Sequence, residues 1–234
     1  MRVALLLGSL ATAAWASRSE TSKSDCELNY WRKARGGEDS NNARRGRNQT
    51  VSMSNGWYKR LFTALFDLDL AFYNDKKVLD IGCGPRGSLE FLAGVARATV
   101  CVDPLALNYS ALGAWSHSMV YVGAPAEVVP LASSSFDVVS SLNSIDHVES
   151  HARVLAEVAR LLRPGGMFLL YTHVGLPPTP CEPSSVRAGF ESDAANAGLR
   201  AHSVRYYVTN ETGANPSHLI KAISTGAAAP VSAA

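Results

Sequence analysis

Short apolar runs alternate with amphipathic segments over most of this chain. Helical patterns lie at 88–97 and 153–162, between some of the apolar runs. Strands that alternate with helices predict a doubly wound, mostly parallel α/β sheet. The apolar runs of strand length occur at 77–81, 98–102, 119–122, 136–142 and 167–172.

Further patterns flank this alternation. Before it, Leu61, Leu65, Leu68 and Phe72 recur at three- and four-residue spacing, which predicts a helix that leads into the domain. After it come a helix at 186–197 and two strands, with a Gly-Ala-Asn-Pro turn between them, at 203–209 and 218–224. This close-set pair predicts a C-terminal antiparallel hairpin at one edge of a seven-stranded sheet.

The first sixteen residues have a pattern of their own. Arg2 precedes an apolar run, and Ala14-Trp15-Ala16 has the small-x-small form that signal peptidase accepts. The run is too short, and too interrupted by Ser and Thr, to span a bilayer comfortably. We expect 1–16 to be a signal peptide and the mature chain to have no transmembrane segment; a buried N-terminal helix is the alternative.

Residues 17–55 differ again. From 17 to 60 the chain holds ten basic and five acidic residues, with little apolar periodicity before Trp57. These features predict a flexible basic arm, followed by a folded domain at 56–224 and a disordered tail at 225–234. An arm that binds anions or nucleic acid is the alternative, but no aromatic residues interleave its arginine run.

Composition limits the architecture and the partners. With 234 residues, 47% of them hydrophobic and 18% charged, the chain fits one α/β domain. Its formal charge of +2 offers no whole-molecule case for nucleic acid or an acidic membrane. Four cysteines are too few for a disulfide scaffold. In an oxidising lumen Cys26 could pair with Cys181, whereas Cys83 and Cys101 are expected to be small packing residues.

Candidate chemistry begins directly after the first strand. Gly82, Gly84 and Gly87 follow it, and residues without a Cβ let backbone amides approach an anionic ligand at the start of the next helix. Asp103 lies 21 residues beyond Gly82, at the tip of the second strand, where it can accept hydrogen bonds from a ribose diol. These features predict a nucleoside cofactor but do not distinguish a dinucleotide from another nucleoside.

Motifs along the chain separate these possibilities. They are VLDIGCG at 78–84, VDPL at 102–105, AEVVPL at 126–131, SFDVV at 135–139 and LLRPGG at 161–166. With them the chain resembles the class I S-adenosylmethionine-dependent methyltransferases (type 11-like) over about residues 76–224. The resemblance implies a Rossmann-like sheet, S-adenosylmethionine as cofactor and methyl transfer as the activity. A non-catalytic, methyltransferase-like binding protein and a nicotinamide-dependent oxidoreductase are the alternatives.

The resemblance also implies roles for individual residues. Asp80 would contact the methionine end of the cofactor, Asp103 would hold both ribose hydroxyls, and Leu105 would pack against adenine. Ala126 and Glu127 would border the adenine pocket. The full set of implied cofactor-binding residues is Asp80, Gly82, Gly84, Asp103, Leu105, Ala126, Glu127 and Asn143.

The acceptor side depends on residues at the same edge of the sheet. His147 follows the fourth parallel strand and is the candidate catalytic base, with a structural histidine as the equal alternative. Asp146 would orient it or cap the next helix. Trp57, Tyr58 and His173 are predicted to contact the acceptor, and no metal site is predicted.

The acceptor class and the compartment are the last expectations. Residues 143–146 read N-S-I-D and lack the Pro-Pro-aromatic sequence with which amino-methylating enzymes stack a flipped base, so no nucleic acid is expected. Apolar and aromatic lid residues favour a small organic acceptor. The signal peptide predicts the secretory pathway or secretion, with a plastid, reached through a two-part targeting sequence, as the alternative.

Overall fold

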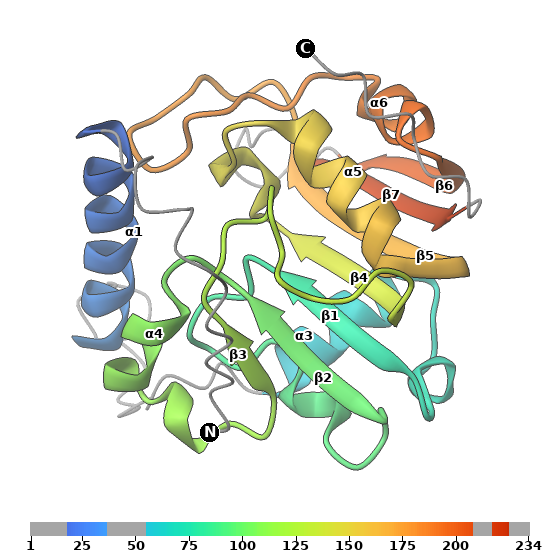
Figure 1. Cartoon of the computed structure of the whole chain (residues 1–234), viewed down its shortest axis with the longest axis horizontal. Coiled ribbons are helices and arrows are strands. Elements are labelled where there is room, and N and C mark those ends of the chain that lie inside the picture. The colour runs from blue at the N-terminus through green and yellow to red at the C-terminus, as the bar shows by residue number, and fades with distance from the viewer. Residues whose placement is uncertain (1–17, 37–54, 208–216, 225–234) are drawn as a thin grey trace.

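Strands form where the apolar runs predict them. The computed structural model describes residues 18–36, 55–207 and 217–224. Five parallel strands have the order β3-β2-β1-β4-β5 (Figure 1). The first strand, β1, is therefore central: β2 and β3 follow on one side of it, and β4 and β5 on the other. The predicted parallel α/β sheet is confirmed. The strands are β1 (Lys77–Ile81), β2 (Ala98–Val102), β3 (Val120–Val122), β4 (Phe136–Leu142) and β5 (Leu162–His173).

Two more strands extend the sheet beyond β5. β7 (Ser217–Ser224) pairs antiparallel with β5, and β6 (Leu199–Tyr207) pairs antiparallel with β7. The order across the described residues is therefore β3-β2-β1-β4-β5-β7-β6. The last strand in the sequence, β7, therefore lies between β5 and β6 and pairs with both of them.

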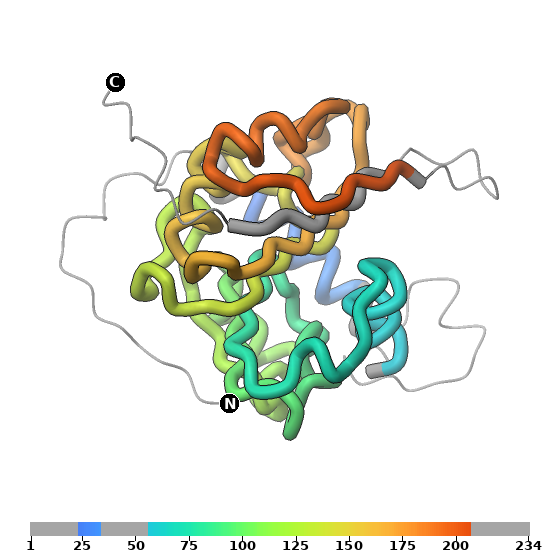
Figure 2. The backbone as a smooth tube through the Cα atoms, turned by 90° about the vertical axis from the view of Figure 1, so that its right-hand side faces the viewer, coloured from blue at the N-terminus to red at the C-terminus, as the bar shows by residue number. Residues whose placement is uncertain are grey.

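Side chains alternate between the two faces of the strands and build a core on each face. Leu79 belongs to the core covered by α5 (His151–Leu161) and α6 (Phe190–Asn196). Its neighbour Val78 belongs to the opposite core, covered by α3 (Asn55–Phe62) and α4 (Ala106–Tyr109). In the side view the α5 layer (yellow) and the α3 layer (cyan) lie on opposite sides of the sheet (Figure 2). The sheet is thus the middle of three layers.

The helix α5 shows how local signals and burial combine. Ser150 caps its N-terminus by accepting a hydrogen bond from the Arg153 amide at 3.4 Å. Its buried positions follow helical spacing, and they are Val154, Leu155, Val158 and Leu161. The helix ends at Leu161, just before Arg163-Pro164, because proline cannot continue it. Because α5 is packed against the core, it keeps the preceding segment, residues 143–150, at the carboxyl end of β4.

Short 3-10 helices replace part of the predicted N-terminal helix. The pattern from Leu61 to Phe72 forms α3 and two such turns instead of one continuous helix. Asp67 interrupts the helix with a φ of 51°, and Asp69 caps the next turn by accepting from the Phe72 amide at 2.8 Å. The 3-10 helices are η1 (Ala64–Phe66), η2 (Leu70–Tyr73), η3 (Glu90–Leu92), η4 (Ser110–Leu112), η5 (Ala114–Ser116) and η6 (Ile145–His147).

The helix predicted at 88–97 is wrong. Only the single turn η3 forms there, and Gly94 leaves the helical region with a φ of +77°. The Glu90 carboxylate accepts hydrogen bonds from the amides of Ser118 at 2.9 Å and Met119 at 2.9 Å. These contacts with a segment distant in sequence favour a compact turn over a helix. The glycine loop is therefore not followed by an α-helix whose N-terminus could face a ligand.

The described part of the basic arm is a helix. Its residues Arg18–Gly36 form the helix α1, which stands across the carboxyl ends of the parallel strands (Figure 1). Leu28 is buried, Trp31 packs against the second core, and a disulfide joins Cys26 to Cys181 in the loop after β5. The prediction of a flexible arm is wrong for these residues, because apolar side chains and a covalent bond hold the helix to the domain.

Some predictions lie outside the described residues. They are the signal peptide at 1–16, the remainder of the arm at 37–54, the turn at 213–216 and the tail at 225–234. Among the helices of the described part, none is long and apolar enough to cross a membrane.

Candidate functional site

Two adjoining pockets open at the carboxyl ends of the parallel strands. The first lies between α1 and the residues that follow β1, β2 and β4. The second has a volume of about 400 Å³ and extends toward α3. The two pockets adjoin each other, because five residues line both of them. They are Glu27, Trp31, Gly82, Asn143 and His147.

The first pocket brings together most of the predicted cofactor-binding residues. Asp80 is the exception, since it lines the second pocket, together with Gly82 and Asn143. The predicted cofactor-binding residues therefore extend from Asp103 in the first pocket, through the residues that line both pockets, to Asp80 in the second. The residues found in the first pocket are Gly82, Gly84, Asp103, Leu105, Ala126, Glu127 and Asn143.

Asp103 is a buried carboxylate at the end of β2. Its Oδ1 accepts hydrogen bonds from the Leu105 amide at 2.9 Å and the Tyr109 hydroxyl at 3.0 Å, and its Oδ2 accepts one from the Gly84 amide at 3.2 Å. Burial raises the pKa of Asp103 to about 6, although these hydrogen bonds oppose the shift. Each carboxylate oxygen has two lone pairs, so Oδ2 keeps one acceptor position for a ligand.

Asp80 is buried near the end of β1. Its Oδ2 accepts from the Ser88 hydroxyl at 2.5 Å and its Oδ1 from the Ser140 hydroxyl at 2.7 Å. Burial raises the pKa of Asp80 to about 7, against the effect of these two hydroxyls. A cationic group placed beside Asp80 would favour its charged form.

The glycine loop passes closely beneath neighbouring side chains. Gly82 has a φ of +69°, and a Cβ there would lie 2.4 Å from Cβ of Ser144. Gly84 has a φ of +62°, and a Cβ there would lie 2.8 Å from Cζ2 of Trp31. Both positions need glycine for conformation and for space. Trp31 thus covers the loop, and the Arg86 guanidinium lies 5.3 Å from the centre of its ring.

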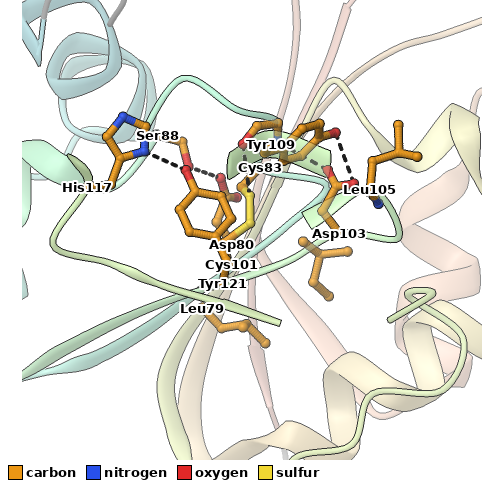
Figure 3. The surroundings of a disulfide bond; sticks show 12 residues. Leu79, Asp80, Cys83, Ser88, Cys101, Asp103, Leu105, Tyr109, His117 and Tyr121 are labelled. Atoms are coloured by element: carbon orange, nitrogen blue, oxygen red, sulfur yellow. Dashed lines mark hydrogen bonds between the residues drawn. A yellow bond between two sulfur atoms is a disulfide. The ribbon is translucent and has the colours of Figure 1, made fainter. Parts of the chain in front are cut away.

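The glycine loop is also crosslinked to the sheet. Cys83 and Cys101 form a disulfide with their Cα atoms 5.7 Å apart, next to Asp80 and Asp103 (Figure 3). The expectation that they are separate packing residues is wrong, because the loop turns back over β2 and brings Cys83 onto Cys101. The pairing of Cys26 with Cys181 is confirmed. All four cysteines of the chain are paired.

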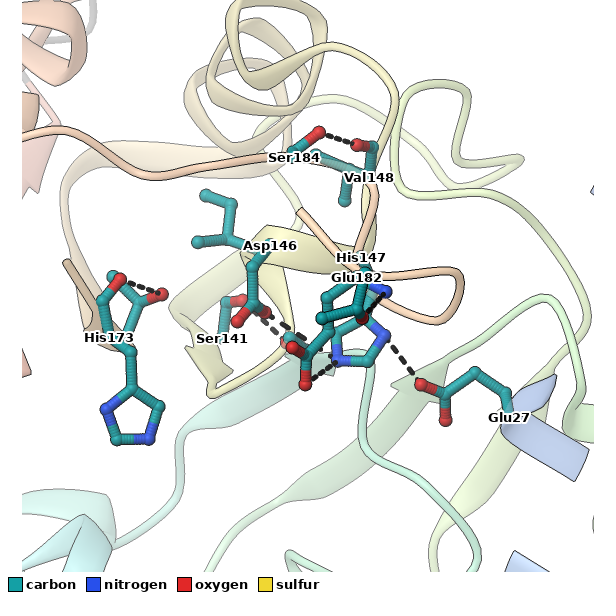
Figure 4. A network of polar contacts seen from close by, with 12 residues as sticks. Glu27, Ser141, Asp146, His147, Val148, His173, Glu182 and Ser184 are labelled. Carbon is teal, nitrogen blue, oxygen red and sulfur yellow. Dashed lines mark hydrogen bonds and ion pairs between the residues drawn. The ribbon is translucent and has the colours of Figure 1, made fainter. Parts of the chain in front are cut away.

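His147 lies in a polar cluster at the junction of the pockets (Figure 4). Its Nδ1 is 2.6 Å from Oε1 of Glu27, and its Nε2 is 3.7 Å from Oδ1 of Asp146 and 3.9 Å from Oε1 of Glu182. Burial alone would lower the pKa of His147, but the hydrogen bond to Glu27 and the three carboxylate charges raise it above its usual value. The imidazole ring thus has an acidic partner at each nitrogen.

The loop after β5 brings Glu182 into this cluster. The amide of Glu182 donates to Thr179 Oγ1 at 3.0 Å, and its carbonyl accepts from the Thr179 amide at 2.8 Å. Farther along, Ser184 donates its amide to the Asp146 carbonyl at 3.0 Å and its hydroxyl to the Val148 carbonyl. These bonds hold the loop against η6, which carries both Asp146 and His147.

The predicted acceptor contacts have different outcomes. Trp57 and Tyr58 line the second pocket, on the side of α3. His173 lines neither pocket; it ends β5 and has Tyr171 as a ring neighbour, with centroids 6.0 Å apart. Glu127 lines the first pocket, but its Oε1 already accepts from the amides of Glu149 at 2.8 Å and Ser150 at 3.2 Å. Part of the Glu127 carboxylate is therefore used to hold the turn before α5.

Sequence reasoning missed the contribution of α1. Four of its residues line the first pocket, and their spacing of one, three and four positions places them on one side of a helix. They are Lys23, Ser24, Glu27 and Trp31. This spacing could have indicated a helix, but the many charged residues of the segment made the pattern hard to recognise. Tyr109, which donates to Asp103, was also missed.

Comparison with known proteins covers the part of the chain that builds this edge. A family model described as "Methyltransferase domain" matches residues 79–170, which run from β1 into β5. The match therefore includes the glycine loop, Asp103, Asn143 and His147, but neither α1 nor Glu182.

Curated relatives match about half of the chain. The chain is 33% identical over 135 residues to phthiotriol/phenolphthiotriol dimycocerosates methyltransferase 1 of Mycobacterium ulcerans, covering 56% of this chain and 46% of that protein. It is 30% identical over 126 residues to thiol S-methyltransferase TMT1B of Rattus norvegicus, covering 51% of each. The chain spans about half the length of these curated relatives.

Solved structures share the fold. One is the Burkholderia thailandensis 1,6-didemethyltoxoflavin-N1-methyltransferase, with bound 1,6-didemethyltoxoflavin and S-adenosylhomocysteine. It aligns with a TM-score of 0.58 at 15% sequence identity, over 91% of this chain and 92% of that one. At this identity the likeness shows a common fold.

Proposed function

The chain belongs to the class I S-adenosylmethionine-dependent methyltransferases, and from this premise we propose that it transfers a methyl group from S-adenosylmethionine to a small organic acceptor. The observation that carries the proposal is the junction of the two pockets at Gly82, Asn143 and His147. A donor that extends from the first pocket past these residues to Asp80 would meet an acceptor in the rest of the second pocket. Alignment of the two reactants away from water is the main requirement of such a transfer.

The first pocket suits the adenosine part of the cofactor. Asp103 retains an acceptor position on Oδ2 for a ribose hydroxyl, and a charge-assisted bond to a buried carboxylate is strong. The walls next to it are apolar and suit the faces of a purine ring; they comprise Pro104, Leu105, Pro125, Ala126 and Val148. The residues present therefore fit the cofactor that the family uses.

Asp80 suits the other end of the cofactor. Its buried carboxylate borders the second pocket, where the cationic amino group of a methionine moiety would favour its ionised form. When bound, the cofactor supplies a methyl group on a sulfonium centre, which is already activated. The chain therefore has to position the donor and acceptor and to manage any proton that the acceptor loses.

The second pocket suits a small acceptor. Its volume of about 400 Å³ falls in the range of about 300–1,000 Å³ that is usual for small-molecule sites. Trp57, Tyr58 and Tyr171 provide aromatic walls, and Arg86 adds one positive charge. His147 is the group best placed to act on the acceptor. Because Nδ1 is held by Glu27, only Nε2 is directed toward the other polar groups.

A binding assay on the full chain tests the cofactor part of this proposal. Equilibrium dialysis against labelled S-adenosylmethionine and NAD is expected to show binding of the former alone. The variant Asp103→Ala should lose about 1–3 kcal/mol of binding free energy through lost charge-assisted bonds. The exposed Asp75→Ala serves as the control and should bind normally. Binding of NAD alone would instead favour the oxidoreductase alternative.

Methyl transfer needs a second assay. The purified chain is incubated with S-adenosylmethionine labelled in the methyl group and a metabolite extract, and labelled products are separated by mass. Products that depend on Asp103 are expected. A chain that binds S-adenosylmethionine but labels nothing would be the non-catalytic alternative.

We also propose the seven-stranded sheet with its antiparallel C-terminal pair as the scaffold of a functional unit over 56–224, with α1 added to it. The registers of β5 with β7 and of β6 with β7 support the first part. The four residues that α1 contributes to the first pocket support the second.

The secretory pathway is the compartment that we propose. Two disulfides that use every cysteine support it, because such bonds persist in oxidising compartments and are rare in the cytosol. A fluorescent protein fused to the C-terminus of the full chain tests this location. Signal in the endoplasmic reticulum or medium is expected, and signal in a plastid would favour the two-part targeting sequence.

A further inference from the structure

The cluster around His147 carries more negative charge than one imidazole can balance. Glu27, Asp146 and Glu182 all approach the ring, and within the described residues their ion pairs go to His147 alone. A protonated His147 would still leave two negative charges uncompensated in a partly buried site. Like charges this close repel one another more strongly than they would in water. The cluster therefore has the charge of a cation-binding site.

Asp146 supplies an independent indication. Its side chain is 8% exposed, and its Oδ1 has no hydrogen-bond partner among the residues that the structure describes. Buried polar atoms nearly always have a partner, since burial without one is costly. The same Oδ1 is directed into the cluster, 3.7 Å from Nε2 of His147. The distance is too long for a hydrogen bond and leaves room for an ion between the two atoms.

Glu27 orients the ring for such a role. Its Oε1 lies 2.6 Å from Nδ1, so Nδ1 carries a proton and donates it to the carboxylate. In the neutral imidazole the lone pair is then on Nε2, which faces Asp146 and Glu182. A histidine held by a carboxylate at one nitrogen and open at the other is the usual arrangement of a metal-binding histidine.

We propose that Oδ1 of Asp146, Nε2 of His147 and Oε1 of Glu182 bind one divalent metal ion beside the second pocket, which His147 and Glu182 line. Each of the three residues offers one ligand atom that lies within 4.8 Å of those of the other two. A tetrahedral ion with ligands at about 2.0–2.2 Å separates its ligand atoms by about 3.3–3.6 Å. The observed separations of 3.7 Å and 3.9 Å from Nε2 are a few tenths of an ångström longer. Binding of the ion requires side-chain rotations that bring the three atoms closer together.

The ligand set favours certain metals. Imidazole nitrogen suits zinc and other transition metals, whereas carboxylate oxygens also suit manganese and magnesium. One nitrogen with two carboxylates therefore points to Zn²⁺ or Mn²⁺ and away from Ca²⁺ and Mg²⁺, which prefer oxygen alone. With three protein ligands, further coordination positions remain for water or for a ligand in the second pocket.

The role of the ion rests on the proposed methyl transfer, although its binding does not. An acceptor hydroxyl bound to the ion would release its proton to solvent more easily. An oxygen lone pair then forms the new bond to the methyl carbon, while the bond from that carbon to sulfur breaks and its electron pair stays on sulfur. The acceptor class that this site selects is a hydroxyl compound. His147 serves as a metal ligand in place of the base that the sequence predicts.

Metal binding is tested on the full chain with both disulfides intact. The chain is first treated with a chelator, and Mn²⁺ binding is then followed by electron paramagnetic resonance, with Zn²⁺ as a competitor. One displaceable ion per chain is expected. Asp146→Asn and Glu182→Gln should each weaken binding by about tenfold or more, and Glu27→Gln by about 10–100-fold through the loss of ring orientation.

Two variants serve as matched controls. Glu149→Gln removes an exposed carboxylate from the segment after Asp146, and His202→Gln removes an exposed imidazole from β6. Both should bind Mn²⁺ like the unchanged chain. Circular dichroism checks that each variant is folded, and the partly exposed Glu182 is the ligand whose replacement disturbs packing least.

The outcomes separate this proposal from the proposed function. Absence of a bound ion at millimolar Mn²⁺ or Zn²⁺, or binding that is unchanged in both Asp146→Asn and Glu182→Gln, overturns the metal site. Binding of S-adenosylmethionine is measured on the same samples. If that binding is intact while no metal binds, the metal site alone is wrong; if metal binds without any methyl transfer, the proposed activity is wrong.

Discussion

Cys26 and Cys181 form a disulfide that spans 155 residues and joins α1 to the loop after β5. The residue after each cysteine is an acid that approaches His147, Glu27 at one ring nitrogen and Glu182 at the other. One covalent bond therefore helps to place two members of the candidate site. It also holds α1 over the first pocket, which α1 helps to line.

Removing this disulfide should loosen α1. In Cys26→Ser/Cys181→Ser we expect the free energy of unfolding to fall by about 2–5 kcal/mol, because the crosslink closes a long loop in the unfolded chain. Amide hydrogen exchange in α1 and around Glu182 should become faster. Mass spectrometry of exchanged peptides measures this, with peptides of β1 and β4 as the internal control. Unchanged protection of α1 would show that noncovalent contacts alone hold the helix.

The energetic cost of adding a side chain where Gly84 meets Trp31 can be measured by comparing Gly84 with Gly94, which has open space around it. Both Gly84→Ala and Gly94→Ala place alanine at a positive φ, which costs about 1–2 kcal/mol. Only at Gly84 would the new Cβ meet another side chain, so Gly84→Ala should lower the free energy of unfolding further. Urea unfolding of both variants gives the difference.

A second background completes that experiment. In Trp31→Ala chains the ring that would collide is absent, so Gly84→Ala and Gly94→Ala should become equally destabilising. If Gly84→Ala keeps its larger cost there, the ring of Trp31 is not the cause.

Cofactor binding should weaken in acid. The pKa of Asp103 is raised to about 6 by burial, and the ionised form is the better acceptor for ribose hydroxyls. Below that pH the affinity for S-adenosylmethionine should fall by up to about tenfold per pH unit, since binding competes with protonation. Calorimetric titration from acid to neutral pH measures it. Asp103→Asn should bind more weakly and lack this part of the pH dependence; an equal slope in the variant would exclude Asp103 as its source.

The free energy of unfolding of the chain without cofactor should fall, rather than rise, as the pH increases. Burial raises the pKa of Asp80 from 3.8 to about 7, so the folded chain holds a proton that the unfolded chain has lost. The stabilisation by neutral Asp80 is complete below about pH 4 and is lost as the pH rises through about 7, by roughly 3–5 kcal/mol. Urea unfolding at several pH values should therefore show a steeper decline for the unchanged chain than for Asp80→Asn. The exposed Asp75→Asn is the control and should retain the decline.

Local sequence was sufficient for the strands and for much of the cofactor pocket. β1, β2 and β4 begin and end where their apolar runs do, because a strand inside the sheet must be apolar on both faces. Asp80, Asp103 and the glycines come directly at strand ends, and parallel strands bring those ends to one edge. Their grouping could be predicted without coordinates.

Tertiary contacts decided the rest. The helix predicted at 88–97 is replaced by one turn, because Glu90 binds amides of a segment almost thirty residues away. The disulfide between Cys83 and Cys101 depends on how the glycine loop folds back over β2. Nothing in the spacing of these cysteines distinguishes a bonded pair from two packing residues.

The cluster around His147 shows the same division most clearly. Asp146 and His147 could be identified as candidates, since they follow β4 at the edge where ligands bind. Glu27 and Glu182 come from a charged N-terminal helix and a proline-rich loop. The possible pairing of Cys26 with Cys181 linked these two segments to each other, but no sequence pattern linked either of them to His147. Apolar periodicity indicates which face of each segment is buried. The contact between four polar side chains from distant segments depends instead on the packing of the whole chain.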